Sequence, residues 1–114
     1  MSLSLQTLAP DVCASPQLAP DDMPAVAAAG FKSVINNRPD GEGGPEQPTS
    51  AQIEAAAKAA GLAYAYLPVN PAVQTPEEIA RFGELLNSLP KPVLAFCRSG
   101  TRSGKLFRAA TGQA

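Results

Sequence analysis

The chain has 114 residues, a net charge of −1 and no histidine, which excludes Ser–His and Cys–His catalytic pairs and most zinc sites. Its two cysteines, Cys13 and Cys97, form no disulfide framework, and we expect no metal and no cofactor. No segment has the roughly 20 apolar residues of a membrane span, and the first residues lack a signal-peptide pattern. We therefore expect residues 1–114 to form a single soluble domain in the cytoplasm, with no membrane partner.

Short apolar runs alternate with helical segments in the first half of the chain. Residues 3–7 and 12–14 could form an edge hairpin. A helix begins at Asp21 and Asp22 and stops at Gly30, with acids early and glycine just past its end. Residues 31–36 predict a strand, and residues 37–48, rich in Gly and Pro, predict a loop.

The alternation continues in the second half. Thr49 or Ser50 caps a helix that ends at Gly61, and residues 62–67 predict a strand. A capping box at residues 75–78 opens a helix that ends before Pro90. Residues 93–96 predict a strand and residues 105–110 a helix. This order favours an α/β fold with a parallel sheet of about four strands, flanked by helices, whose ligands gather at the carboxyl ends of the strands.

The segment from Phe96 to Ser103 is the strongest functional signal. A strand that ends at Cys97 and turns tightly into a helix directs backbone N–H groups and the helix dipole at one spot. Arg102 can fold back over this turn as a two-pronged anion donor. These features stabilise a thiolate, so the segment predicts a cysteine nucleophile in an anion cradle. A small apolar core cysteine is the alternative.

The predicted cradle is formed by one continuous run of polar residues. Its members, which would bind an anion through their backbone N–H groups, are Arg98, Ser99, Gly100, Thr101, Arg102 and Ser103. Gly100 is expected to adopt a positive φ or to allow a close backbone approach. Ser103 would donate a hydrogen bond to the thiolate or cap the following helix. Arg98 would add positive potential at the rim, although an exposed loop arginine often has no specific role.

Charge is unevenly distributed along the chain. All ten acidic residues lie at or before Glu84, whereas five basic residues and no acidic ones follow it. Such an end attracts a small anionic substrate. We do not expect nucleic acid as a partner, because the two aromatic residues of this stretch, Phe96 and Phe107, are placed as core.

Three stretches of the sequence carry a resemblance to a known family. They are "SPQLAPDDMPAVAAAGFKSVINNRPDGE", "QPTSAQIEAAAKAAGLAYAYLPV" and "LPKPVLAFCRSGTRS". Together they resemble, from about residue 5 to residue 103, the small bacterial phosphatase-like domain found beside β-lactamase-type hydrolases. The resemblance implies a fold like that of protein tyrosine and dual-specificity phosphatases. Some members of this family are fused to sulfide- or persulfide-oxidising modules.

The residues of the loop bear on the choice between two chemistries. Tyrosine phosphatases have five residues between cysteine and arginine, whereas four separate Cys97 from Arg102, as in rhodaneses. Asn70 lies about where a phosphatase would carry its general acid, and an asparagine cannot protonate a leaving group. The prediction is therefore a rhodanese-like sulfurtransferase. Cys97 would take sulfur from thiosulfate or a persulfide and pass it to a thiol such as glutathione.

Two other functions remain open at this point. One is a cysteine-dependent phosphatase acting on a phosphate-like anion. The other is a non-catalytic sulfur-relay or anion-binding module that works with a sulfide- or persulfide-oxidising protein.

Several further residues are weaker candidates. Asn37, Arg38, Asp40 and Asn70 follow predicted strands and could border the pocket, although an Arg38–Asp40 pair that only orders its loop is an equal alternative. Cys13 could resolve a Cys97 persulfide, but a buried structural cysteine is favoured.

Overall fold

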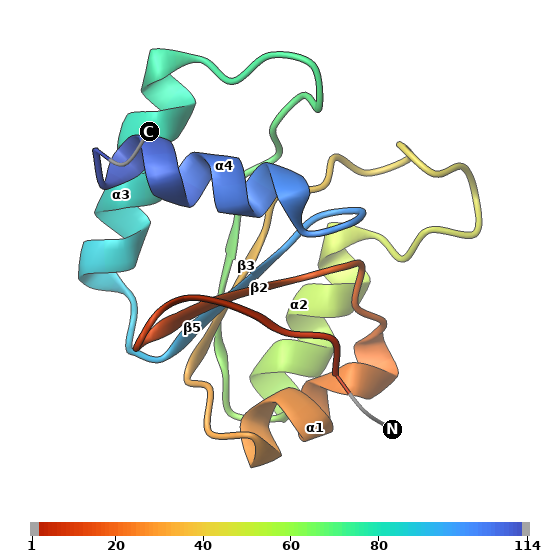
Figure 1. Ribbon diagram of the computed structural model, residues 1–114. Helices are drawn as coiled ribbons and strands as arrows, with labels where there is room; N and C mark the ends of the chain where they lie inside the picture. The colour runs from red at the N-terminus through yellow and green to blue at the C-terminus, as the bar shows by residue number, and fades with distance from the viewer. Residues whose placement is uncertain (1–2, 113–114) are drawn as a thin grey trace.

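A five-stranded sheet lies between two pairs of helices in the computed structural model of the chain, which describes residues 3–112 (Figure 1). The strands are β1 (Gln6–Ala9), β2 (Val12–Ser15), β3 (Ser33–Asn36), β4 (Ala63–Tyr66) and β5 (Val93–Phe96). The helices are the 3-10 turn η1 (Pro20–Asp22), α1 (Met23–Ala28), α2 (Ser50–Ala59), α3 (Pro76–Ser88) and α4 (Thr101–Ala110). No helix within residues 3–112 combines the length and apolar character needed to cross a membrane.

The strand order is β1-β2-β5-β3-β4. Strands β2, β5, β3 and β4 are parallel, and β1 runs antiparallel to β2. The predicted α/β fold with a parallel sheet of four strands is therefore confirmed, and the edge hairpin forms. Its second strand is not at the edge, however, because β2 lies between β1 and β5. The carboxyl end of β2 consequently reaches the same end of the sheet as those of β3, β4 and β5.

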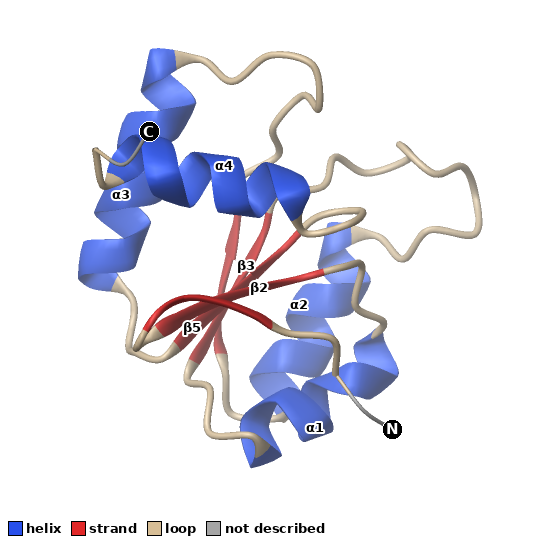
Figure 2. Ribbon diagram, viewed as in Figure 1, coloured by secondary structure: helices blue, strands red, loops and turns tan. Residues whose placement is uncertain are grey.

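Helices cover both faces of the sheet (Figure 2). On β5, Val93 and Ala95 pack in the cluster that α3 and α4 complete, whereas Leu94 and Phe96 pack in the cluster beneath α1 and α2. All four residues of β5 are buried. A strand covered on both sides is apolar throughout and shows no alternation, which explains its appearance as a continuous apolar run.

Capping residues set the helix boundaries much as predicted. Thr75 Oγ1 accepts a hydrogen bond from Glu78 N at 3.1 Å, and Glu78 Oε1 accepts one from Thr75 N at 2.9 Å. Thr49, rather than Ser50, caps α2 in the same way. Helix α4 begins at Thr101, earlier than the predicted start at residue 105, because Gly100, with a φ of 93°, ends the loop and serves as its N-cap.

Candidate functional site

Cys97 lies directly after β5, at the start of a tight loop of residues 97–100, which we call the cysteine loop. Its side chain is 1% exposed, and its Sγ accepts a hydrogen bond from Gly100 N at 3.0 Å. A Cβ on Gly100 would lie 3.3 Å from the carbonyl carbon of Ser15, so the loop is pressed against the end of β2. Gly100 therefore provides both features expected of it, a positive φ and a close backbone approach.

A pocket of about 100 Å³ opens above Cys97. Its lining comprises Pro71, Gln74, Cys97, Ser99, Thr101, Arg102 and Lys105. The N–H groups of the first helical residues have no carbonyl one turn back to accept them, and here these are Thr101, Arg102 and Ser103. The positive end of the α4 dipole thus adjoins the thiol. The structure brings the predicted nucleophile and the predicted arginine to one small cavity.

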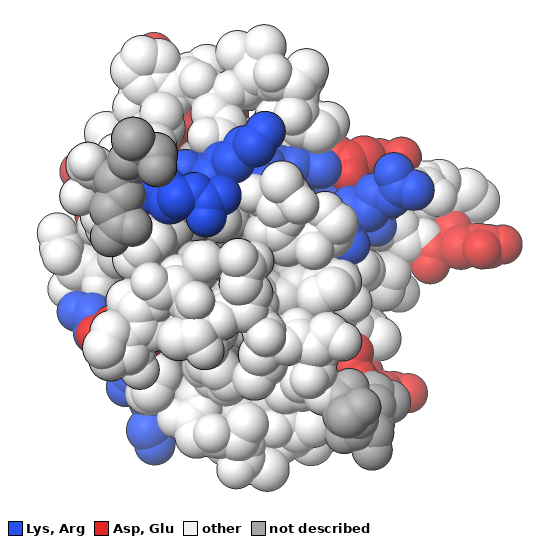
Figure 3. Space-filling model, viewed as in Figure 1, with Lys and Arg blue, Asp and Glu red and all other residues white. Residues whose placement is uncertain are grey.

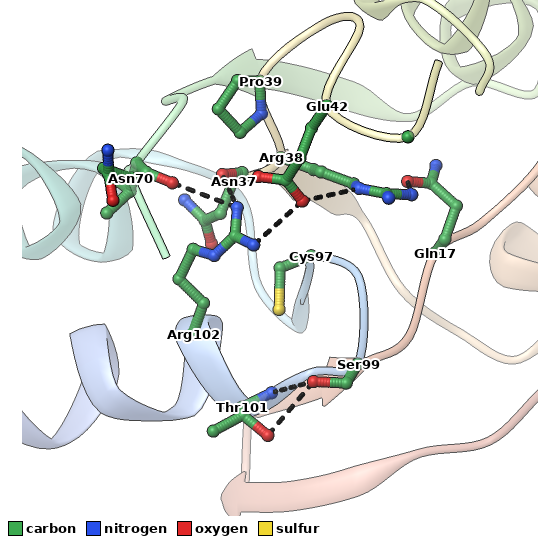
Figure 4. A network of polar contacts seen from close by, with 12 residues as sticks. Gln17, Asn37, Arg38, Pro39, Glu42, Asn70, Cys97, Ser99, Thr101 and Arg102 are labelled. Atoms are coloured by element: carbon green, nitrogen blue, oxygen red, sulfur yellow. Dashed lines mark hydrogen bonds and ion pairs between the residues drawn. The ribbon is translucent and has the colours of Figure 1, made fainter. Parts of the chain in front are cut away.

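Arg102 is the most constrained charged residue of the site. Its guanidinium lies beside Cys97 and is held by three acceptors (Figure 4). Nη1 donates to the carbonyl oxygens of Val69 at 3.0 Å and Asn37 at 3.4 Å, and Nη2 donates to Glu42 Oε2 at 3.0 Å. Its buried Nε has no partner within residues 3–112. An anion bound above Cys97 would supply the acceptor that this donor lacks.

Glu42 belongs to this network but is absent from the sequence prediction. Its Oε2 accepts hydrogen bonds from both Arg102 and Arg38, the latter from Nε at 2.9 Å. Burial alone would raise the pKa of this carboxyl, but the hydrogen bonds and charges of Arg102 and Arg38 outweigh it and hold the pKa below 4.5. Glu42 is therefore an ionised bridge. The four-residue spacing from Arg38 hints at their pairing, whereas the sequence gives no sign of the contact with Arg102, 60 residues away.

Asn37 and Ser103 brace the site from beneath. Ser103 Oγ donates to Asn37 Oδ1 at 2.8 Å, and Asn37 Nδ2 donates to the carbonyl of Leu67 at 3.0 Å. Ser103 thus has neither of the two expected partners, because Gly100 caps α4 and the hydroxyl proton is used on Asn37. Both side chains are fully buried, which ties the end of β3 to the first turn of α4.

The other proposed rim residues hold the surrounding loops and do not line the pocket. Arg38 pairs with Glu42 and not with Asp40, whose Oδ1 instead accepts from Ser50 N at 2.7 Å. Asn70 Oδ1 accepts from Ala72 N at 2.7 Å, which makes it a turn residue. Arg98 is exposed.

Two glutamines were also missed by the sequence prediction. Gln17 follows β2. Its backbone N–H donates to the carbonyl of Arg98 at 3.2 Å, and its side-chain Oε1 accepts from Arg38 Nη1 at 3.1 Å. Gln74 lines the pocket and donates from Nε2 to the carbonyl of Arg102 at 3.1 Å. Neither belongs to a motif, and only the approach of their loops to the cysteine loop gives them a role. Cys13, by contrast, lies within β2 and does not line the pocket.

Solved structures share this fold. A candidate phosphatase from Neisseria meningitidis is 36% identical, with a TM-score of 0.85 over 95% of this chain and 78% of that one. A candidate phosphatase from Shewanella putrefaciens is 24% identical, with a TM-score of 0.78 over 96% of this chain and 68% of that one. P. aeruginosa TpbA, solved in complex with phosphotyrosine, is 16% identical, with a TM-score of 0.71 over 98% of this chain and 66% of that one.

Curated relatives are much longer than this chain. The Agrobacterium fabrum beta-lactamase hydrolase-like protein is 43% identical over 86 residues, which are 75% of this chain and 20% of the relative. The protein of the same description from Xylella fastidiosa is 40% identical over 87 residues, 76% of this chain and 20% of the relative. The chain therefore corresponds to about a fifth of these proteins.

These likenesses overturn the predicted sulfurtransferase. The solved structures described above that share the fold include candidate phosphatases and a protein solved with phosphotyrosine, and none of them is described as a sulfurtransferase. The glutathione-like acceptor and the sulfide-oxidising partner depended on that prediction, and they have no support either. The physical reason is that a thiolate in an anion cradle can attack sulfur or phosphorus, so the four-residue spacing between Cys97 and Arg102 does not distinguish the two reactions.

The resemblance seen in the sequence is confirmed over nearly the whole chain. The model of one family, described as beta-lactamase hydrolase-like protein, phosphatase-like domain, matches residues 4–114. This match includes every strand, every helix and all the residues that surround Cys97. The chain belongs to the family of phosphatase-like domains of beta-lactamase hydrolase-like proteins.

Proposed function

We propose that this chain is a cysteine-dependent phosphatase, a hydrolase in which Cys97 is the nucleophile and Arg102 binds the phosphate. The observation that carries the proposal is the single pocket that Cys97, Arg102 and the first turn of α4 share. Family membership and the phosphotyrosine bound by TpbA, a protein of the same fold, support a phosphate ester as the small anionic substrate. We place residues 1–114, as one domain, in the cytoplasm, where the thiol stays reduced.

The reaction would proceed in two displacements. The Cys97 thiolate attacks phosphorus, the bond from phosphorus to the ester oxygen breaks, and the leaving oxygen takes the electron pair. Arg102 and the amides of the first turn of α4 would bind the three equatorial oxygens. Water then attacks the cysteinyl phosphate, which releases inorganic phosphate and a proton and restores the thiolate. The sum is ester plus water to alcohol plus phosphate.

Leaving-group protonation sets the preferred ester. Glu42, the carboxylate that contacts Arg102, is held ionised and is therefore a poor proton donor. Asn70 carries an amide and is engaged in a turn. Protonation would fall to water, a disadvantage that is smallest for a phenolate leaving group. We therefore assign aryl phosphates, including phosphotyrosine, as the preferred substrate class.

The test is hydrolysis of p-nitrophenyl phosphate by the purified chain. Replacing the nucleophile, Cys97→Ser, should lower kcat/KM by at least about 10³-fold. Cys13→Ser removes the other thiol, away from the pocket, and should leave kcat/KM unchanged. The proposal fails if the wild-type chain does not hydrolyse aryl phosphates or if Cys97→Ser is as active as wild type. Phosphate binding without any turnover would instead support the anion-binding module.

A further inference from the structure

The pocket above Cys97 is too small for a whole metabolite. Its volume of about 100 Å³ is below the roughly 300–1,000 Å³ of sites that enclose a small molecule. Such a cavity takes the reacting phosphate alone. The rest of any substrate must therefore lie on the surface around the pocket mouth, and the side chains of that surface decide which esters bind.

One row of side chains leads from the pocket along α4. Thr101 and Lys105 line the pocket, and Arg108 follows after three more residues. Spacings of four and three place all three side chains on the same face of the helix. At 1.5 Å per residue, the Cα atoms of Lys105 and Arg108 lie about 6 and 10 Å along the axis from Thr101.

Arg108 extends back toward the pocket. A Cβ on Gly104 would lie 3.6 Å from Arg108 Nη2 and 3.7 Å from Nη1. The guanidinium thus covers the glycine one turn closer to the start of α4, where a larger side chain would take up this space. Lys105 and Arg108 together form what we call the α4 cation pair.

Within residues 3–112 the α4 cation pair has no acidic partner. The four ion pairs within residues 3–112 use Arg38, Lys58, Arg81 and Arg102, and none uses Lys105 or Arg108. The last thirty residues contain no acidic side chain. Basic atoms accordingly gather over α4 on the face shown in Figure 3. Glu42 carries one negative charge against Arg38 and Arg102, so that cluster keeps one net positive charge, and Lys105 and Arg108 extend the positive charge from the pocket along α4.

We propose that the α4 cation pair binds a second phosphate group, so that the preferred substrates are small esters carrying two phosphates. This inference rests on the phosphatase function proposed above and narrows its substrate class. The first phosphate would occupy the pocket and the second would lie over α4 between Lys105 and Arg108. Two cations spaced over about one helical turn match one additional phosphate, whereas a nucleic acid would require a longer basic surface.

The kinetic test compares 1,3-phenylene bisphosphate with phenyl phosphate, which share the same type of leaving group. The wild-type kcat/KM should favour the bisphosphate by about tenfold after correction for its two equivalent groups. In the double variant Lys105→Gln/Arg108→Gln, this ratio should fall to about twofold or less. Lys91→Gln removes an exposed charge before β5, at the opposite end of the strand from Cys97, and should keep the ratio.

Salt provides a second readout, because exposed charges are screened. Raising the salt concentration from about 0.05 to about 0.5 M should reduce the wild-type ratio several-fold and leave that of the double variant nearly constant. A wild-type ratio near one, or a ratio that the double variant retains, would overturn the inference.

Binding separates this inference from the proposed function. Calorimetry on Cys97→Ser should show that pyrophosphate binds about tenfold more tightly than inorganic phosphate. This difference should be lost in the triple variant Cys97→Ser/Lys105→Gln/Arg108→Gln. If this difference is found but neither ester is hydrolysed, binding of a second phosphate by the α4 cation pair is supported and the proposed phosphatase function is wrong. If the esters are hydrolysed but pyrophosphate binds no more tightly than inorganic phosphate, the phosphatase function is supported and the proposed binding of a second phosphate is wrong.

Discussion

The carboxylate of Glu42 holds two arginines at once. One of its oxygens accepts from Arg38 and from Arg102, while the side chain remains only 20% exposed. The backbone carbonyls of Asn37 and Val69 fix the other side of the Arg102 guanidinium. Because the Arg102 guanidinium is already fixed on both sides, its side chain loses little conformational entropy when an anion binds. In the proposed reaction Glu42 would thus position Arg102.

Replacing this residue, Glu42→Gln, should destabilise the protein in a pH-dependent way. The pKa of Glu42 is lower in the folded chain than its ordinary value of 4.5, so the charged form stabilises the fold above that pH. The stability advantage of wild type, on the order of 1 kcal/mol at pH 7, should shrink as the pH falls below 4.5 and through the lowered pKa. Urea unfolding at pH 7 and at successively lower pH measures this difference.

An exposed ion pair is the matched control. Glu54, paired with Lys58 on α2, is 43% exposed, so Glu54→Gln should cost no more than about 0.5 kcal/mol. Equal losses at both positions, or a Glu42 effect that persists unchanged in acid, would contradict the bridging role. A fall in kcat/KM of Glu42→Gln at pH 7 would distinguish positioning of Arg102 from a purely structural contribution.

At the scale of elements, two glycines have opposite requirements. Gly100 has a φ of 93° and leaves only 3.3 Å between a Cβ and the end of β2. Gly83, within α3, lacks a positive φ, and a Cβ there would make an ordinary 3.7 Å contact with that of Ala110. Gly100 is needed for the junction of β5 and α4. Gly83 lowers the stability of α3, although no steric constraint requires a glycine there.

Alanine at these two positions should therefore have opposite effects. Gly83→Ala should raise the free energy of unfolding by about 0.5–1 kcal/mol, because alanine loses less backbone entropy in a helix. Gly100→Ala should lower it by at least about 1–2 kcal/mol, because an L-residue is strained in the left-handed region and crowds Ser15. Urea unfolding of both variants checks the sign. A neutral Gly100→Ala would remove the argument for the tight junction.

Local signals predicted the elements well, and long-range contacts limited the prediction of the site. Capping at Thr75 and the apolar run before Cys97 are encoded in adjacent residues, and both were found where expected. The insertion of β2 beside β5 depends on pairing between residues 81 positions apart in the sequence, which no local pattern reveals. For the same reason Gln17 and Glu42 were missed, since each reaches the site through a loop whose path depends on the complete sheet.

At the scale of the whole molecule, loops from four strands meet at the pocket. The ends of β2, β3, β4 and β5 lie at one edge of the sheet because these strands are parallel. Their loops supply Gln17, Glu42, Gln74 and Cys97 to the network around the pocket. Asp40 anchors the loop that carries Glu42. Its backbone N–H donates to the hydroxyl of Tyr66, and its side chain accepts a hydrogen bond from Ser50 N.

Anion binding should accordingly stabilise the whole fold. Inorganic phosphate at about 100 times its Kd should add about 2.7 kcal/mol to the free energy of unfolding and raise Tm by several degrees. Arg102→Lys keeps the charge but loses the two-pronged geometry, so its Tm should respond much less at the same phosphate concentration. Arg81→Lys, in an exposed pair with Glu84 on α3, should respond like wild type. An unshifted wild-type Tm would contradict phosphate binding at this pocket.

The meeting of four distant loops has a consequence for partly denatured forms of the protein. Detaching any one of these loops would empty the cavity while most helical turns stayed intact. In a denaturant titration, ligand affinity would therefore be lost at a lower denaturant concentration than the far-ultraviolet circular dichroism signal. An excised peptide containing only the cysteine loop would not bind the ligand.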